Sequence, residues 1–141
     1  MNIQHQFRAK AFHNSEWVNG NFIHSKRFQG CGNEFRIHNQ YSGIESDVVP
    51  ETVGLFTGQQ SEDKQDIYQD DIIVFRMPDD HFWGELLNTE KIGVVKWSED
   101  KCGFIVEWAW SNNQHHVNFN CDIALNAWIL GNIHDNPDLI P

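Results

Sequence analysis

The segment from Asp66 to Phe75 constrains the fold of this chain more than any other. It begins with an acidic turn and ends in a run of β-branched and aromatic residues, Ile72-Ile73-Val74-Phe75. Successive side chains of a strand point to opposite faces of a sheet, so this run places apolar residues on both faces. A strand with two apolar faces is typical of the interior of a fold. We therefore predict that this segment supplies a central strand, covered above and below.

The N-terminal part of the chain predicts a hairpin followed by shorter elements. Gln6–Phe12 has the alternation of a strand, and the β signal resumes at Trp17 after a polar turn. Gly20 indicates a second turn or a bulge. Farther along, Glu34–His38 favours a short strand, and the proline in Val49–Val53 favours a single helical turn.

The C-terminal part contains the clearest hairpin, with arms at Ile92–Trp97 and Gly103–Trp110. His115–Phe119 favours a further strand, whereas Ala124–Leu130 fits a helix or a strand by its pattern alone. Large apolar residues occupy every second position of the second hairpin arm, which predicts a face in the core: Phe104, Val106, Trp108 and Trp110.

These signals define a fold class. Short β runs alternate with turns at a spacing of roughly 8–12 residues, and long amphipathic helical windows are absent from the sequence. We predict a mainly β fold in which antiparallel strands form a small SH3-like barrel or a sandwich, with an added N-terminal β-hairpin and short helical turns. Asn136 is expected to cap the last of these turns, with Pro137 at its first position.

The length of the chain favours one domain. Domains usually contain about 100–150 residues, and this chain has 141. Within this single domain, 1–141, the pattern allows at most a division into an N-terminal β subregion at 1–60 and a barrel-like core at 61–141.

The balance of charge limits the classes of function. Twenty Asp and Glu residues against ten Lys and Arg give a formal net charge of -10. A protein that binds a duplex through its phosphates needs a basic surface, so we expect no direct binding of duplex DNA. The same charge suits a basic protein surface as a partner.

The N-terminus and the cysteines predict the compartment. Met1–Phe7 has no apolar signal-peptide core, and no run approaches the ~18 apolar residues of a membrane span. Cys31, Cys102 and Cys121 are odd in number and widely spaced, which favours free thiols in a reducing cytosol. We expect a cytoplasmic protein with no membrane partner.

Two groups of residues have side chains that could bind a metal ion, but neither has a standard spacing. His115, His116, Cys121 and Asp122 offer mixed ligands, yet adjacent histidines of a strand point to opposite faces. Asp70 and Asp71 with Asp66, or Asp79 and Asp80 with His81, could form a catalytic pair of acids or bind Mg²⁺. These acids flank predicted turns, where local hydrogen bonding by Asp accounts for their presence without a ligand. We predict no metal site.

The residues that could serve in nucleophilic catalysis or in base stacking also have simpler explanations. Cys102 lies in a hairpin turn with only Lys101 beside it and no obvious base, which favours an inert thiol. Five tryptophans could stack on nucleic-acid bases: Trp83, Trp97, Trp108, Trp110 and Trp128. Packing in the core accounts for them without a ligand, although one exposed aromatic could still serve as an anchor at a protein interface. We predict no catalytic residues, no cofactor and no enzymatic activity.

Five segments in the same order carry a family resemblance. The chain resembles the YopX family of phage and prophage proteins, whose patterns are FRAW…W…G.F, PETVGQYTG, IYEGDIV, GVVEW and GNIYENPEL. The similar segments here are Phe7–Ala9 with Trp17–Phe22, Pro50–Gly58, Ile67–Ile73, Gly93–Trp97 and Gly131–Leu139. Gln69 and Asp70 stand where the pattern has an acid and a glycine. If that glycine has a positive φ, Asp70 can still adopt it, at some cost.

The resemblance implies a phage or prophage origin, a mostly β fold and cytoplasmic residence, and it brings no site residues. We interpret the chain as a non-enzymatic accessory protein that binds an unidentified host or phage protein or forms a homo-oligomer. The alternative is an acidic DNA mimic that inhibits a host nucleic-acid-binding protein, which requires an ordered row of acids rather than acids scattered over turns. A small hydrolase or metal enzyme would require a pocket with perturbed titratable groups.

We predict no useful affinity for duplex DNA near physiological salt. The ten basic residues are spread from Arg8 to Lys101, and Lys26-Arg27 is the only adjacent pair. Fluorescence anisotropy of a labelled duplex, titrated at low and moderate salt, measures this affinity. Micromolar binding that weakens steeply with salt and is lost on replacing Lys26 and Arg27 would contradict the prediction. It would indicate a basic groove formed by Arg8, Lys10, Lys26, Arg27 and Arg36.

Overall fold

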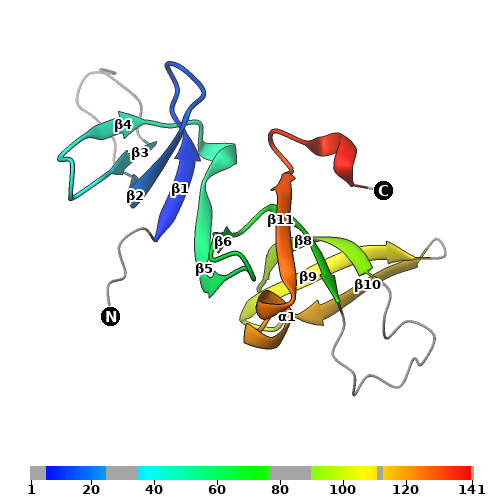
Figure 1. Ribbon diagram of the computed structural model, residues 1–141. Coiled ribbons are helices and arrows are strands. Elements are labelled where there is room, and N and C mark those ends of the chain that lie inside the picture. The colour runs from blue at the N-terminus through cyan, green and yellow to red at the C-terminus, as the bar shows by residue number, and fades with distance from the viewer. Residues whose placement is uncertain (1–5, 25–34, 77–89, 111–112, 141) are drawn as a thin grey trace. The chain divides into compact units, whose positions relative to one another are not determined.

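The computed structural model describes residues 6–24, 35–76, 90–110 and 113–140, with Trp110 described by its backbone alone. The chain forms two compact units, Met1–Phe56 and Thr57–Pro141. Strands dominate the described parts of both units, with one short α-helix and two 3-10 turns (Figure 1). The prediction of a mainly β fold is confirmed.

The first unit is built on an antiparallel sheet. β4, β3, β2 and β1 pair in this order within the unit, and β1 also pairs with the start of β5. β5 continues into the second unit, which contains β6. The proline in Pro50–Thr52 occupies the first position of the predicted helical turn, η2. The strands are β1 (Phe7–Lys10), β2 (Trp17–His24), β3 (Phe35–His38), β4 (Glu45–Asp47), β5 (Gly54–Gln60) and β6 (Asp66–Tyr68).

One face of the first unit's sheet is a phenylalanine-rich core. The ring of Phe22 packs between those of Phe7 and Phe35, at centroid distances of 5.7 and 6.2 Å. These rings surround a fully buried centre formed by Ala9, Ile37 and Val48. Aromatic rings bury a large area each, so a few of them suffice to hold four short strands together.

The prediction of a second turn or bulge at Gly20 is wrong. β2 runs without interruption from Trp17 to His24 and pairs with β1 and β3 on its two sides. Gly20 lies in this strand with φ 155°, and a Cβ atom there would collide with the carbonyl group of His38. The glycine therefore permits the close approach of β3 and does not reverse the chain.

The second unit contains a five-stranded antiparallel sheet with the order β10-β9-β8-β7-β11. The predicted hairpin is confirmed as β8 and β9, with Val95 opposite Val106 and Trp97 opposite Phe104. The elements are β7 (Asp71–Arg76), β8 (Glu90–Ser98), β9 (Gly103–Trp110), β10 (Asn113–Asn118), α1 (Cys121–Leu125), β11 (Ala127–Asn132) and the terminal turn η4 (Pro137–Leu139).

β7 is the central strand that the sequence predicts. It pairs with β8 on one side and β11 on the other. Ile72 on one face, and Ile73 and Phe75 on the other, are all fully buried. The main core lies on the face with Ile73 and Phe75, and α1 contributes Ile123 to it. The other buried residues of this core are Ile67, Val95, Val106, Ala124 and Ala127. Phe104 and Trp108 pack against this core, as their alternation predicts.

No closed barrel forms within the described residues. β10 and β11 stand at opposite edges of the five-stranded sheet and do not pair with each other. The ambiguous segment Ala124–Leu130 divides between the end of α1 and the first part of β11. Asn120 begins the helix, because its side-chain oxygen accepts a hydrogen bond from the Ile123 amide at 3.0 Å.

The predicted terminal turn is confirmed as η4, with Asn136 at its N-cap position and Pro137 at its start. The Asn136 side chain makes no capping hydrogen bond. Its Oδ1 accepts instead from the Asn132 amide at 3.3 Å. The side chain therefore folds back onto β11.

Among the described residues, no helix is long and apolar enough to cross a bilayer.

Gly93 is predicted to be a packing constraint of the second unit. A Cβ atom at this position would lie 2.7 Å from Val106 Cγ1 and 3.2 Å from Phe75 Cε1. Both neighbours are fully buried, so Gly93→Ala should lower the free energy of unfolding by about 1–3 kcal/mol. Urea denaturation of the full chain measures the difference.

Gly103→Ala is the matched control, because the nearest atom to a Cβ there is the Lys101 carbonyl oxygen at 3.8 Å. We expect a change within about 0.5 kcal/mol for this variant. Equal effects of the two substitutions would contradict the packing argument.

Candidate functional site

The residues considered for a metal site do not converge. His115 stacks its ring on Trp108 at 5.6 Å, whereas His116 is exposed on the other face of β10. Cys121 is exposed at the start of α1. Within the described parts of the chain, no three His, Cys, Asp or Glu side chains are arranged to hold a metal ion.

The other candidates divide between exposed turns and segments outside the described residues. Cys102 is exposed in the β8–β9 turn, where its Sγ donates to the Glu99 carbonyl oxygen at 3.4 Å. Trp97, also exposed, packs edge-to-face on Phe104 at 5.1 Å. Cys31, Asp79, Asp80, His81 and Trp83 lie outside the described residues.

The backbone of the turn between β6 and β7 is hydrogen-bonded to β8 and to the C-terminal segment of the second unit. Asp70 has a φ of 73°, in the left-handed region that favours glycine. Its amide donates to the Val95 carbonyl in β8 at 2.7 Å, and its carbonyl accepts from the Ile133 amide at 3.0 Å. The sequence allowed a positive φ at Asp70, and the structure has one there.

The two aspartates of this turn have structural partners. Asp70 Oδ2 lies 3.2 Å from His134 Nε2, and the two side chains are only 16% and 17% exposed. Asp71 is fully buried, and its Oδ2 accepts from the Tyr68 amide at 2.8 Å. These carboxylates fix a backbone turn and a neighbouring side chain, as local hydrogen bonding by Asp predicts.

The C-terminal residues form a second polar turn against the first. Asn132 is buried, and its Oδ1 accepts from the amides of His134 and Asp135 at 3.0 Å each. Its Nδ2 donates to Asp135 Oδ2 at 3.1 Å. Gly131 leaves room for Asn136, because a Cβ there would collide with the Asn136 side chain. This turn fixes the direction in which the last residues leave β11.

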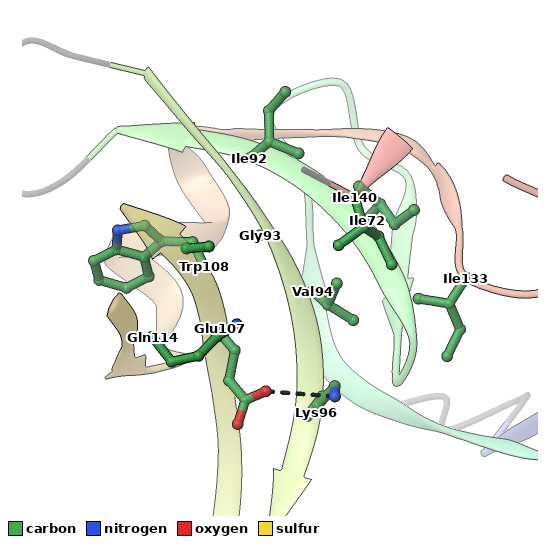
Figure 2. Close-up of a pocket in the computed structure, with 11 residues that line it drawn as sticks. Ile72, Ile92, Gly93, Val94, Lys96, Glu107, Trp108, Gln114, Ile133 and Ile140 are labelled. Carbon is green, nitrogen blue, oxygen red and sulfur yellow. Dashed lines mark ion pairs between the residues drawn. The ribbon is translucent and has the colours of Figure 1, made fainter. Parts of the chain in front are cut away.

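A shallow groove lies on the face of the sheet opposite the main core. Ile72 and Val94 form part of its wall, and Ile133 and Ile140 reach it from the C-terminal segment (Figure 2). Its volume is about 190 Å³. Lys96 and Glu107 form an ion pair of 3.4 Å at its rim. The groove therefore has an apolar floor and a charged rim.

Ile92 and Ile140 are the exposed large apolar side chains of this groove. They are 39% and 42% exposed, whereas Ile72 and Val94 are buried. The sequence pattern does not reveal the groove, because its wall combines residues of β7, β8, β9 and β10 with Ile133 and Ile140 of the C-terminal segment.

The first unit has a separate groove and a cluster of cations on an aromatic ring. The groove, of about 290 Å³, is lined by Trp17, Val18, Asn19, Ile37, Asn39, Ser42, Ile44 and Ser46. The Arg8 guanidinium lies 4.6 Å and the Lys10 ammonium 5.7 Å from the centre of the Trp17 ring. Arg36 pairs with Glu45 at 2.8 Å. Lys26 and Arg27 lie outside the described residues.

Lys91 is the titratable group that its surroundings clearly shift among the described residues. Burial disfavours the charged ammonium and lowers the pKa of Lys91 from its usual value. It lies opposite Phe75 in the β7–β8 ladder, whereas Asp70 bonds to Val95, nearer the other end of β8. The lysine and the Asp70–His134 pair therefore do not form one site.

The fold and the polar turn define a two-unit antiparallel β protein whose aspartates and asparagines organise its own backbone. The family model described as "YopX protein" matches residues 6–141, and the chain belongs to the YopX family. No curated protein matches the chain.

Asp70 and His134 contact each other in the structure. The carboxylate and the imidazole lie 3.2 Å apart although the residues are 64 apart in the sequence, and only the fold brings them together. We expect this contact to offset part of the cost of a positive φ at a non-glycine residue.

We expect the effect of Asp70→Gly on stability to depend on residue 134. With His134 present, the substitution relieves backbone strain but removes the contact, so the free energy of unfolding should change by less than about 0.5 kcal/mol. In a His134→Tyr background the contact is already lost, and Asp70→Gly should stabilise by about 1 kcal/mol. Denaturant unfolding of the four proteins forms a double-mutant cycle. Equal effects of Asp70→Gly in the two backgrounds would rule out the coupling.

Proposed function

We propose that this chain is a non-enzymatic phage or prophage accessory protein that binds a basic protein in the cytoplasm of a bacterial host. The division of charge between the two units supports this most directly. Residues 1–56 contain five basic and five acidic residues, whereas residues 57–141 contain five basic and fifteen acidic residues. The whole net charge of -10 therefore belongs to the second unit. Such a field accelerates the encounter with a positively charged partner.

The groove of the second unit gives this partner an apolar contact. Acidic residues attract the partner over a distance, but exposed charge pairs contribute little affinity by themselves. Ile92 and Ile140 offer an accessible apolar surface beside the Lys96–Glu107 pair. An apolar anchor of the partner, surrounded by its own basic residues, fits both features.

A non-enzymatic role accords with the positions of the acids. Asp70 and Asp71 serve the turn, and Glu90 pairs with Arg76 at 3.2 Å. A catalytic pair would need carboxyl groups that face a pocket, in environments that separate their pKa values.

The DNA-mimic alternative draws on the same charge but requires acids in a regular row. The exposed acids of the second unit lie mostly in turns, at Glu62 and Asp63 after β5 and at Glu99 and Asp100 after β8. This scattered arrangement favours a general acidic contact over a copy of the phosphate backbone.

Affinity capture with the full-length chain tests the proposal. A basic protein should be retained from host or phage-infected lysate at low salt and released as salt is raised, since salt screens exposed charges. Ile92→Ser should weaken its retention about tenfold, because it removes an accessible apolar contact. Leu125→Ser is the matched control, because Leu125 is 56% exposed in α1 and does not line the groove.

Two outcomes would count against the proposal. Retention of no basic protein, or retention that is indifferent to both salt and Ile92→Ser, would rule out the groove of the second unit as the contact. Release of the captured protein by competing duplex DNA would favour the mimic.

A further inference from the structure

The four edges of the two sheets differ in how they are protected against pairing with another strand. β4 and β6 each have three residues and include acidic side chains. β11 carries a register shift between Ile129 and Gly131. β10 is six residues long, has the sequence NQHHVN, and keeps one register with β9 over its whole length. Without a charge, a proline or a bulge, β10 lacks the features that usually protect an edge strand.

The backbone of β10 alternates between its partner strand and the open side. The Phe119 amide, directly after the strand, donates to the Phe104 carbonyl in β9 at 2.9 Å. In an antiparallel ladder, residues that exchange hydrogen bonds with the partner strand alternate with residues whose peptide groups point away. The peptide groups of His115 and Val117 therefore point toward β9. The peptide groups of Gln114, His116 and Asn118 point outward, and among the described residues no strand pairs with them.

The side chains follow the same alternation. His115 stacks on Trp108, and Val117 packs against the main core. Gln114, His116 and Asn118 are exposed and carry no acidic or basic side chain other than the imidazole. The outward peptide groups thus belong to residues whose side chains lie on the face opposite the core.

We propose that β10 pairs with β10 of a second copy of this chain, antiparallel and about a two-fold axis at His116. In this register the peptide groups of His116 meet those of the partner's His116, and those of Gln114 meet those of the partner's Asn118. All three outward residues then occupy hydrogen-bonded positions, which shorter overlaps do not achieve. The pairing joins two five-stranded sheets into one and keeps both cores on the same face.

The choice of a second copy rests on charge and on the symmetry of the strand. Antiparallel pairing of identical strands is self-complementary, and no formal charges meet across the edge. Outside the edge, each copy carries a net charge of -10, so the two copies repel each other at longer range. Association should therefore strengthen as salt is raised, because salt screens this repulsion. The opposite salt dependence is expected for the basic partner, so the two interactions can be told apart.

Sedimentation equilibrium of the full-length chain over a range of concentration and salt measures the association. His116→Pro removes an outward amide and leaves the bonds to β9 in place, so the dimer constant should weaken about tenfold or more. His116→Thr keeps the amide and favours a strand, and it should retain the dimer. Circular dichroism confirms that the variants are folded.

Mixing two charged variants provides a test that does not depend on proline. His116→Lys and His116→Glu each place like charges opposite each other, so each should be monomeric. An equimolar mixture should form a heterodimer. A monomeric wild-type chain at its highest soluble concentration would overturn the proposal, as would a dimer that His116→Pro and the charged variants do not change.

Discussion

The backbone of Asp70 holds the second unit together at one point. Its amide bonds to β8 and its carbonyl bonds to the C-terminal segment, while the next residue begins β7. Both bonds require φ 73°, because this conformation turns the chain sharply between β6 and β7. Each bond contributes on the order of 1 kcal/mol, and together they set where three segments meet.

The faces of the second unit follow from this junction. With β7 placed between β8 and β11, Ile73 and Phe75 point into the core and Ile72 to the opposite face. The C-terminal turn, held by Asn132, then brings Ile133 to the groove above Ile72. The groove is thus a product of the turn as much as of the sheet.

Local pattern predicted the elements whose side chains alternate clearly. β7 and the β8–β9 hairpin are recognisable because apolar residues recur at every second position over a strand's length. β4 was not predicted, since Glu-Ser-Asp has no strand preference and its position depends on pairing with β3. Gly20 suggested a turn because the approach of the His38 carbonyl is a tertiary contact. The Asn132–Asn136 hydrogen bond and the Asp70–His134 contact required the fold for the same reason. A positive φ at Asp70 was expected only on the condition that the glycine of the family pattern has one.

The Asp70–His134 contact also bears on the order of folding. The two residues are 64 apart in the sequence, and the strands β7 to β11 lie between them. A contact across so long a segment closes a large loop, and the entropy of that closure has to be offset by other contacts first. We therefore expect the C-terminal turn to dock on Asp70 after the five-stranded sheet has formed.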